Sequence, residues 1–266
     1  DAASGKVIWR AKLKAPARSA PAISNGRLFV VTVENEVVAL STAKGERLWN
    51  YTGVASETGI LGGGTPAVAN GIVIAPQSSG ELVALRAENG NAIWTESIAA
   101  TRRRNPVTSL TTITANPVID RGMVFAVSNA GRLAAIDLRT GRRAWDLDIG
   151  GLETPWVAGK YLYVITNRGE LAAVTRDDGK VRWVIRLERF VDDKDLIDGR
   201  PSWSGPVLAS DRLVVAGSHG EALSVSPYTG EVLGWVPLDK GVMIQPVVAS
   251  NSILFLDMTG RLSALR

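Results

Sequence analysis

The chain has 266 residues, of which 45% are hydrophobic, and 30 Lys and Arg against 26 Asp and Glu give it a net charge of +4. This mild excess, without a basic stripe of stacking aromatic residues, argues against a nucleic-acid-binding protein. The absence of cysteine excludes disulfides, thiolate zinc sites and cysteine nucleophiles. No apolar run reaches the ~20 residues that a membrane-spanning helix needs.

One pattern of predicted strands repeats along the chain. Each repeat begins with a short apolar strand led by proline, at Pro21–Ile23, Pro66–Val68, Pro117–Ile119, Pro155–Val157, Pro206–Leu208 and Pro246–Val248. After a polar turn comes a continuous apolar strand, at Leu28–Val31, Ile72–Ile74, Met123–Phe125, Tyr161–Val164, Leu213–Val215 and Ile253–Leu256. A third strand with small residues follows, at Glu36–Leu40, Gly80–Leu85, Gly131–Ile136, Gly169–Val174, Gly220–Val225 and Gly260–Leu265. Apolar runs of this kind are typical of strands covered on both faces.

A turn and a fourth strand complete the repeat with the pattern Gly-x-x-x-Trp. It contributes Trp9, Trp49, Trp94, Trp145 and Trp183, and a copy with one extra residue contributes Trp235. Four strands repeated at roughly 40 to 50 residues indicate a β-propeller. We therefore predict an all-β fold of six four-stranded antiparallel blades, forming one domain over residues 1–266, with these tryptophans docked between blades.

The two ends of the chain leave two arrangements open. The last repeat stops at Arg266 without its Gly-x-x-x-Trp strand, whereas residues 4–9 form such a strand with nothing before it. Either this strand completes the last blade of a closed six-bladed ring, or the chain is part of a larger ring. Because the chain starts at Asp1 without methionine or a signal-like segment, we expect a processed product or a fragment whose N-terminal address is lost.

Three long segments follow docking tryptophans and are expected on one face of the propeller. They cover about residues 50–65, 95–116 and 184–205. Long loops on a rigid scaffold are where binding residues tend to lie. The second segment carries Arg102, Arg103 and Arg104, which could pair with an acidic partner, pair with the acidic loop of another blade, or be solvated.

The motif Ala-x-Asp-x-x-Thr-Gly-x-x-x-Trp, complete from Ala135 to Trp145, resembles the tryptophan-docking PQQ-like repeat of quinoprotein-type propellers. The whole run of repeats is most similar to the BamB family, the β-propeller lipoproteins of the outer-membrane β-barrel assembly machine in Gram-negative bacteria. The resemblance implies an eight-bladed ring, of which this chain supplies six blades.

The resemblance also implies a function. It predicts a non-catalytic scaffold, in the periplasm and peripheral to the outer membrane, with any lipid anchor outside this chain. Its partners would be the barrel-inserting subunit of the machine and unfolded outer-membrane protein clients. The implied contact residues are Thr58, Gly59, Ile60, Leu61 and Gly62, although the arginine of the family loop is absent. A second family loop carries acidic residues, and its counterpart at residues 111–117 has none.

The alternative is a PQQ-dependent dehydrogenase-like enzyme or a ligand-sensing propeller. We expect no catalytic residue, cofactor or metal, because the repeats place apolar or small residues where such ligands would converge. His219 is the single histidine, so it cannot build a histidine pair, and we expect a solvated turn residue. The acidic residues from Asp192 to Asp198 lack the glycine and glutamate that complete an EF-hand loop and are expected to be solvated.

Overall fold

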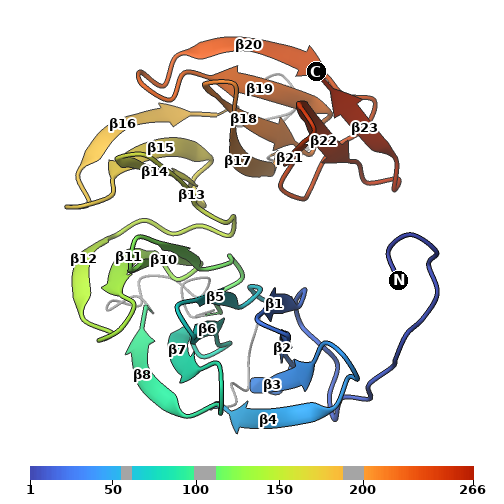
Figure 1. Cartoon of the computed structure of the whole chain (residues 1–266). Coiled ribbons are helices and arrows are strands. Elements are labelled where there is room, and N and C mark those ends of the chain that lie inside the picture. The colour runs from blue at the N-terminus through green and yellow to red at the C-terminus, as the bar shows by residue number, and fades with distance from the viewer. Residues whose placement is uncertain (55–61, 99–111, 188–200) are drawn as a thin grey trace. The chain divides into compact units, whose positions relative to one another are not determined.

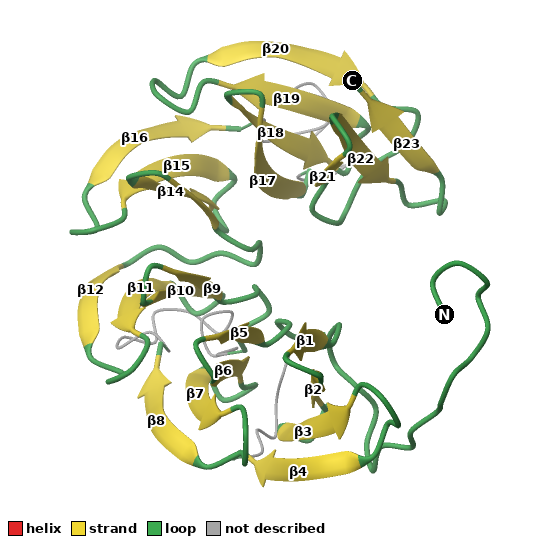
Figure 2. Cartoon of the chain, viewed as in Figure 1, coloured by secondary structure: helices red, strands yellow, loops and turns green. Residues whose placement is uncertain are grey.

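The computed structural model describes residues 1–54, 62–98, 112–187 and 201–266. The chain divides into two compact units, Asp1–Ala144 and Trp145–Arg266, and each is described by itself. Strands and turns make up the described residues, which contain no helix (Figure 2). Consistent with this, none of them forms an apolar helix long enough to cross a membrane.

The first unit contains three sheets of four strands (Figure 1). Its strands are β1 (Ala22–Ser24), β2 (Arg27–Val31), β3 (Glu36–Ser41), β4 (Arg47–Thr52), β5 (Ala67–Ala69), β6 (Ile72–Pro76), β7 (Glu81–Arg86), β8 (Ala92–Ser97), β9 (Val118–Asp120), β10 (Met123–Ser128), β11 (Arg132–Asp137) and β12 (Arg143–Leu147). Strand β12 spans the boundary between the units. The innermost strands β1, β5 and β9 contact one another in sequence order, as neighbouring propeller blades require.

The second unit contains two four-stranded sheets and one three-stranded sheet. Its strands are β13 (Trp156–Ala158), β14 (Tyr161–Ile165), β15 (Glu170–Thr175), β16 (Val181–Arg186), β17 (Trp203–Ala209), β18 (Arg212–Gly217), β19 (Glu221–Val225), β20 (Val232–Pro237), β21 (Val247–Ala249), β22 (Ser252–Leu256) and β23 (Leu262–Leu265). Here too the first strands of successive sheets, β13, β17 and β21, lie in contact. The predicted all-β fold with six blades is confirmed, and the assignment of residues 1–266 to one domain stays a prediction.

The register of the third and fourth strands explains the small residues of the repeat. Ala39 lies opposite Trp49, and Ala84 lies opposite Trp94, so a small side chain faces each indole. A β-bulge follows directly in both sheets, and the same irregularity recurs in β15 and β19. Bulges bend a strand and increase its twist. The repeat therefore encodes the room that the tryptophan needs.

Five of the six motif tryptophans dock on the glycine turn of the next repeat in the chain. The five glycines are so close to an indole ring that an added Cβ would overlap it, at Gly45, Gly90, Gly141, Gly179 and Gly230. The indole N–H donates to the backbone carbonyl three residues before that glycine, in Trp9 to Thr42, Trp49 to Ala87, Trp94 to Leu138, Trp145 to Arg176 and Trp183 to Pro227. Trp235 is 61% exposed, and its docking role stays a prediction.

The turn that receives each tryptophan is held by its own side chains. In the third repeat the Asp137 carboxylate accepts hydrogen bonds from the Thr140 hydroxyl at 2.7 Å and from its backbone N–H at 2.8 Å. These bonds lower the pKa of Asp137. Gly141 follows with a φ of 71°, which glycine adopts without strain. The docking surface is therefore a preformed turn.

Candidate functional site

The predicted partner-binding residues lie mostly outside the described part of the chain. This applies to Thr58, Gly59, Ile60 and Leu61, and to Arg102, Arg103 and Arg104. Gly62 is described: its φ is 91°, and a Cβ added there would meet no atom within 4 Å. The candidate site is therefore built from the residues on either side of segment 55–61.

Gly63 and Gly64 lie where the chain packs too closely for a side chain. A Cβ on Gly63 would overlap the guanidinium of Arg18, and one on Gly64 would overlap the backbone carbonyl of Ala115. The Gly64 N–H donates to the carbonyl of Ile113 at 3.3 Å. The glycine run therefore serves close packing between this segment and two other parts of the first unit.

The arginine under this run is buried. Arg18 precedes β1, is 9% exposed, and donates its backbone N–H to the Val31 carbonyl at 2.9 Å. Its Nη1 donates to Asn35 Oδ1 at 2.8 Å. No carboxylate pairs with it in the part of the chain that the structure describes, and burial lowers the pKa of its guanidinium. A buried charge without a counter-ion costs free energy. Arg18 Nη2 is also buried and makes no hydrogen bond to the described residues.

Asn35 links this arginine to two neighbouring loops. It lies in the turn between β2 and β3 with a φ of 59° and is 1% exposed. Its Nδ2 donates to the Val54 carbonyl at 2.6 Å and to Ser78 Oγ at 2.7 Å. The Ser78 N–H donates back to Asn35 Oδ1 at 3.1 Å, and the Gly53 N–H donates to the Asn35 carbonyl at 3.0 Å. All polar groups of the Asn35 side chain are thus engaged.

Alanine substitutions along the glycine run should separate backbone conformation from close packing. We expect Gly64→Ala to destabilise the chain by about 1–3 kcal/mol, because the new Cβ overlaps a backbone carbonyl that cannot move alone. Gly62→Ala should cost about 1 kcal/mol, from its positive φ only. Urea unfolding measures both. A larger effect at Gly62 than at Gly64 would contradict the close-packing role.

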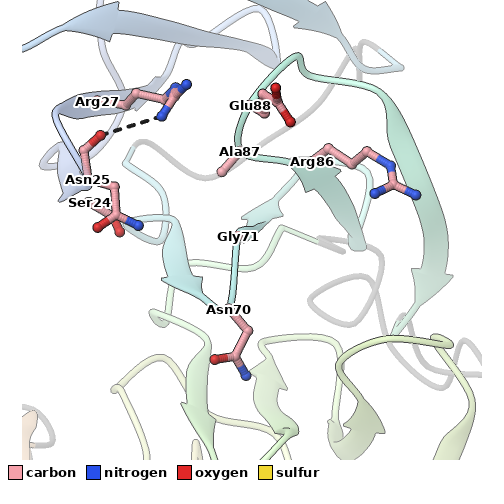
Figure 3. Close-up of a pocket in the computed structure, with 8 residues that line it drawn as sticks. All are labelled: Ser24, Asn25, Arg27, Asn70, Gly71, Arg86, Ala87 and Glu88. Atoms are coloured by element: carbon pink, nitrogen blue, oxygen red, sulfur yellow. Dashed lines mark hydrogen bonds between the residues drawn. The ribbon is translucent and has the colours of Figure 1, made fainter.

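A polar cavity of about 290 Å³ lies at the turns of the first two blades (Figure 3). Its lining comes from the turns after β1, β5 and β7 and includes Arg27, Arg86 and Glu88. The Ala87 carbonyl on its wall accepts the indole N–H of Trp49. The lining residues contain no pair of carboxylates and no nucleophile with an adjacent base, so they form no catalytic constellation.

His219 differs from the sequence-based expectation of a solvated residue. Its side chain is 6% exposed, its Nε2 lies 3.4 Å from Glu221 Oε2, and its ring meets Trp203 edge-on at 5.1 Å. The expectation was wrong because the first residues of β17 cover the turn that holds His219. Throughout residues 1–54, 62–98, 112–187 and 201–266, no three His, Asp or Glu side chains gather in a way that could hold a metal ion.

In the second unit, the carboxyl group of Glu153 has a strongly raised pKa. It lies just before β13, and its Oε2 accepts the Gly205 N–H at 3.2 Å. Burial raises its pKa to about 7, against the opposing effect of that hydrogen bond. Because no second titratable side chain interacts with it in the described part of the chain, we assign Glu153 a structural role.

The repeat pattern did not predict the Arg18–Asn35 pair, but a departure from that pattern marks the position of Asn35. The other five repeats have glycine at the corresponding position of the turn before the third strand, and the first repeat has Asn35. Asparagine tolerates a positive φ and adds an amide that can bind neighbouring chain. Arg18 is likewise the one charged residue in the small apolar stretch from Ala15 to Ala20.

Comparison with known proteins identifies similar chains. A family model described as outer membrane protein assembly factor BamB matches residues 1–185. The protein of that name from Yersinia pestis is 27% identical over 265 residues, covering 99% of this chain and 65% of the relative. The chain spans less than two thirds of the length of the curated relatives that it matches.

Solved structures show the same fold. The crystal structure of BamB from Moraxella catarrhalis has a TM-score of 0.85 at 18% identity and covers 99% of this chain and 76% of that one. A quinohemoprotein alcohol dehydrogenase from Pseudomonas putida has a TM-score of 0.65 at 18% identity, covering 86% of this chain and 43% of that one. At these identities the likeness concerns the fold alone, which scaffolds and enzymes share.

Proposed function

This chain belongs to the family of the outer membrane protein assembly factor BamB, and from this membership we propose that it is a non-catalytic scaffold for outer-membrane protein assembly. The observation that carries the proposal is the family match over residues 1–185. Rigid blades with docked tryptophans and long connecting segments suit a protein that presents loops to partners.

We infer that its partner is the barrel-inserting subunit of the outer-membrane β-barrel assembly machine, with unfolded outer-membrane proteins as clients. The scaffold would then work in the periplasm at the outer membrane. The proposed contacts are Thr58 to Gly62, with Ile60 and Leu61 as the apolar residues, and Arg102 to Arg104 for acidic groups. A few well-packed side chains that lose contact with water supply most of the binding energy of a protein interface.

Charged substitutions in the first proposed contact test this directly. We expect Ile60→Asp with Leu61→Asp to weaken binding of the purified barrel-inserting subunit at least about 30-fold, because the two proposed apolar contacts would be replaced by charges without a partner. Isothermal titration calorimetry measures the dissociation constant. Val7→Asp with Ile8→Asp is the matched control, since these neighbouring apolar residues are 55% and 73% exposed. Equal binding by the two double variants would refute the proposed contact.

Enzyme activity offers an independent test of the scaffold proposal. The purified chain, incubated with pyrroloquinoline quinone and calcium, is expected to show no dye-linked alcohol oxidation above a blank without protein. Turnover that scales with the protein concentration would overturn the non-catalytic assignment.

A further inference from the structure

The cavity between the first two sheets carries two opposite charges that are not paired with each other. Arg27 begins β2 and Glu88 lies in the turn between β7 and β8, and both line the cavity of about 290 Å³. Figure 3 shows the two side chains on facing turns of the two sheets. In the part of the chain that the structure describes, neither forms an ion pair. Both charges are therefore available to a bound molecule.

The guanidinium of Arg27 is only weakly engaged by the protein itself. Its Nη1 donates to the Asn25 carbonyl at 3.4 Å, which is longer than a strong hydrogen bond. Its Nε is buried and donates no hydrogen bond to the described residues. A carboxylate that approaches this guanidinium would form charge-assisted bonds, which are stronger than bonds between neutral groups. The arginine therefore gains more from a charged ligand than from its present neighbours.

The blade architecture does not require a charge at this position. The second strand of the other sheets begins with Ile72, Met123, Tyr161, Arg212 or Ser252. The sheets that begin this strand with Ile72, Met123 and Tyr161 have the same four-stranded order as the sheet of Arg27. Apolar residues thus serve the fold equally well at the start of this strand, and the charge of Arg27 calls for another explanation.

The rest of the lining suits a small polar ligand. Asn25 and Asn70 are exposed, and each amide side chain offers both donors and an acceptor. One wall is held in place by a docked tryptophan, because the Ala87 carbonyl accepts the indole N–H of Trp49 at 3.0 Å. The volume lies near the lower limit of small-molecule sites, which is about 300 Å³. A molecule about as large as one amino acid therefore fits the cavity.

We propose that this cavity binds a small zwitterion of the α-amino acid class, with its carboxylate on Arg27 and its ammonium group on Glu88. A simple anion suits the cavity less well, because Glu88 repels it, and a simple cation is repelled by Arg27 in the same way. A molecule with both charges pairs with both side chains and leaves no charge unpaired. This inference goes beyond the proposed scaffold role and does not depend on it.

Three probes of related shape test the charge requirement on the whole chain. L-norvaline carries both charges, pentanoate lacks its ammonium group, and 1-aminobutane lacks its carboxylate. Nuclear magnetic resonance follows the Arg27 Nε–H signal as each probe is added and yields a dissociation constant. We expect L-norvaline to shift this signal saturably, and the two singly charged probes to bind at least about tenfold more weakly.

Variants of the two charged residues should weaken L-norvaline binding at least about tenfold. Arg27→Met introduces the residue that the third sheet has at this position, Met123, and Glu88→Gln removes the opposite charge. Lys44→Gln and Glu46→Gln are the matched controls. They make the same changes in charge at the exposed turn between β3 and β4, outside the cavity lining, and should keep the affinity within about twofold. For variants without the Arg27 signal, titration calorimetry gives the dissociation constant.

Urea midpoints show whether each variant is folded. If Arg27→Met does not fold, Arg27→Lys takes its place, and it should also weaken binding because lysine keeps the charge without the two-pronged geometry. The inference is overturned if L-norvaline produces no saturable shift, or if the controls lose as much affinity as the cavity variants. Pentanoate that binds the wild type as tightly as L-norvaline, and Glu88→Gln more tightly still, would make the cavity a simple anion site and refute the zwitterion assignment.

Discussion

Replacing Trp49 by alanine is expected to lower the free energy of unfolding by about 3–5 kcal/mol, the range for a buried large aromatic residue. Trp49 is 9% exposed, packs on Gly90 and lies 5.7 Å from Phe29 between ring centroids. Its indole N–H also donates to the Ala87 carbonyl. Alanine would remove this packing, leave a cavity and strand that carbonyl acceptor. Urea-induced unfolding of the whole chain measures the loss.

Two further variants divide this loss into its parts. Trp49→Phe keeps most of the aromatic packing and loses the hydrogen bond, so we expect a cost smaller than that of alanine by about 2 kcal/mol or more. Trp235→Ala is the matched control, because Trp235 is 61% exposed and should cost under about 1 kcal/mol. Similar losses for Trp49→Ala and Trp235→Ala would show that docking on the next glycine turn does not stabilise the blades.

The fold was predictable because its determinants are local and repeated. The turn that ends at Gly141 is specified by Asp137 and Thr140, which bond to each other within four residues. The tryptophan four residues later then has a defined glycine to meet in the next repeat. Each copy of the pattern independently predicts the same four-stranded blade architecture. An error in one repeat therefore does not change the predicted fold.

The Arg18–Asn35 network was not predictable, because its contacts join positions far apart in sequence. Arg18 bonds to a residue 17 positions away, and Asn35 bonds to Ser78 across 43 positions. No local pattern specifies such pairs. A departure from the repeat, asparagine in place of glycine, marks the position without naming its partners. Positions of this kind are therefore found by comparing each repeat of the sequence with the other repeats.

His219 shows a second limit of prediction from sequence, which concerns burial rather than hydrogen-bond partners. A polar residue between two strands is usually solvated, because hairpin turns lie at the surface. In this chain the start of β17 lies against that turn, and Trp203 packs against the imidazole. The covering residue comes from 16 positions earlier, outside the hairpin itself. Local context therefore predicted the turn correctly and its burial wrongly.

The stability of the second unit is expected to fall as the pH rises from about 4.5 to about 7, because Glu153 keeps its proton in the folded state. Its pKa is raised from 4.5 to about 7, mainly by burial. Between these values the folded state binds more protons than the unfolded state, so the free energy of unfolding decreases with pH, by at most about 3 kcal/mol. Above pH 7 the loss is complete.

Glu153→Gln should abolish this contribution and leave the variant more stable than the wild type at pH 8. Glutamine cannot ionise, and its carbonyl oxygen can still accept the Gly205 N–H. Urea midpoints of the wild type and the variant at several pH values between 4 and 8 give the difference curve. Glu231→Gln is the control, because Glu231 lies at an exposed turn of the same unit and its replacement changes the formal charge equally. This variant should keep the decrease in stability between pH 4.5 and 7 that is assigned to Glu153. A Glu153→Gln curve parallel to that of the wild type would mean that this carboxyl is already ionised in the folded chain at pH 5, and that the Gly205 N–H and solvent offset its burial.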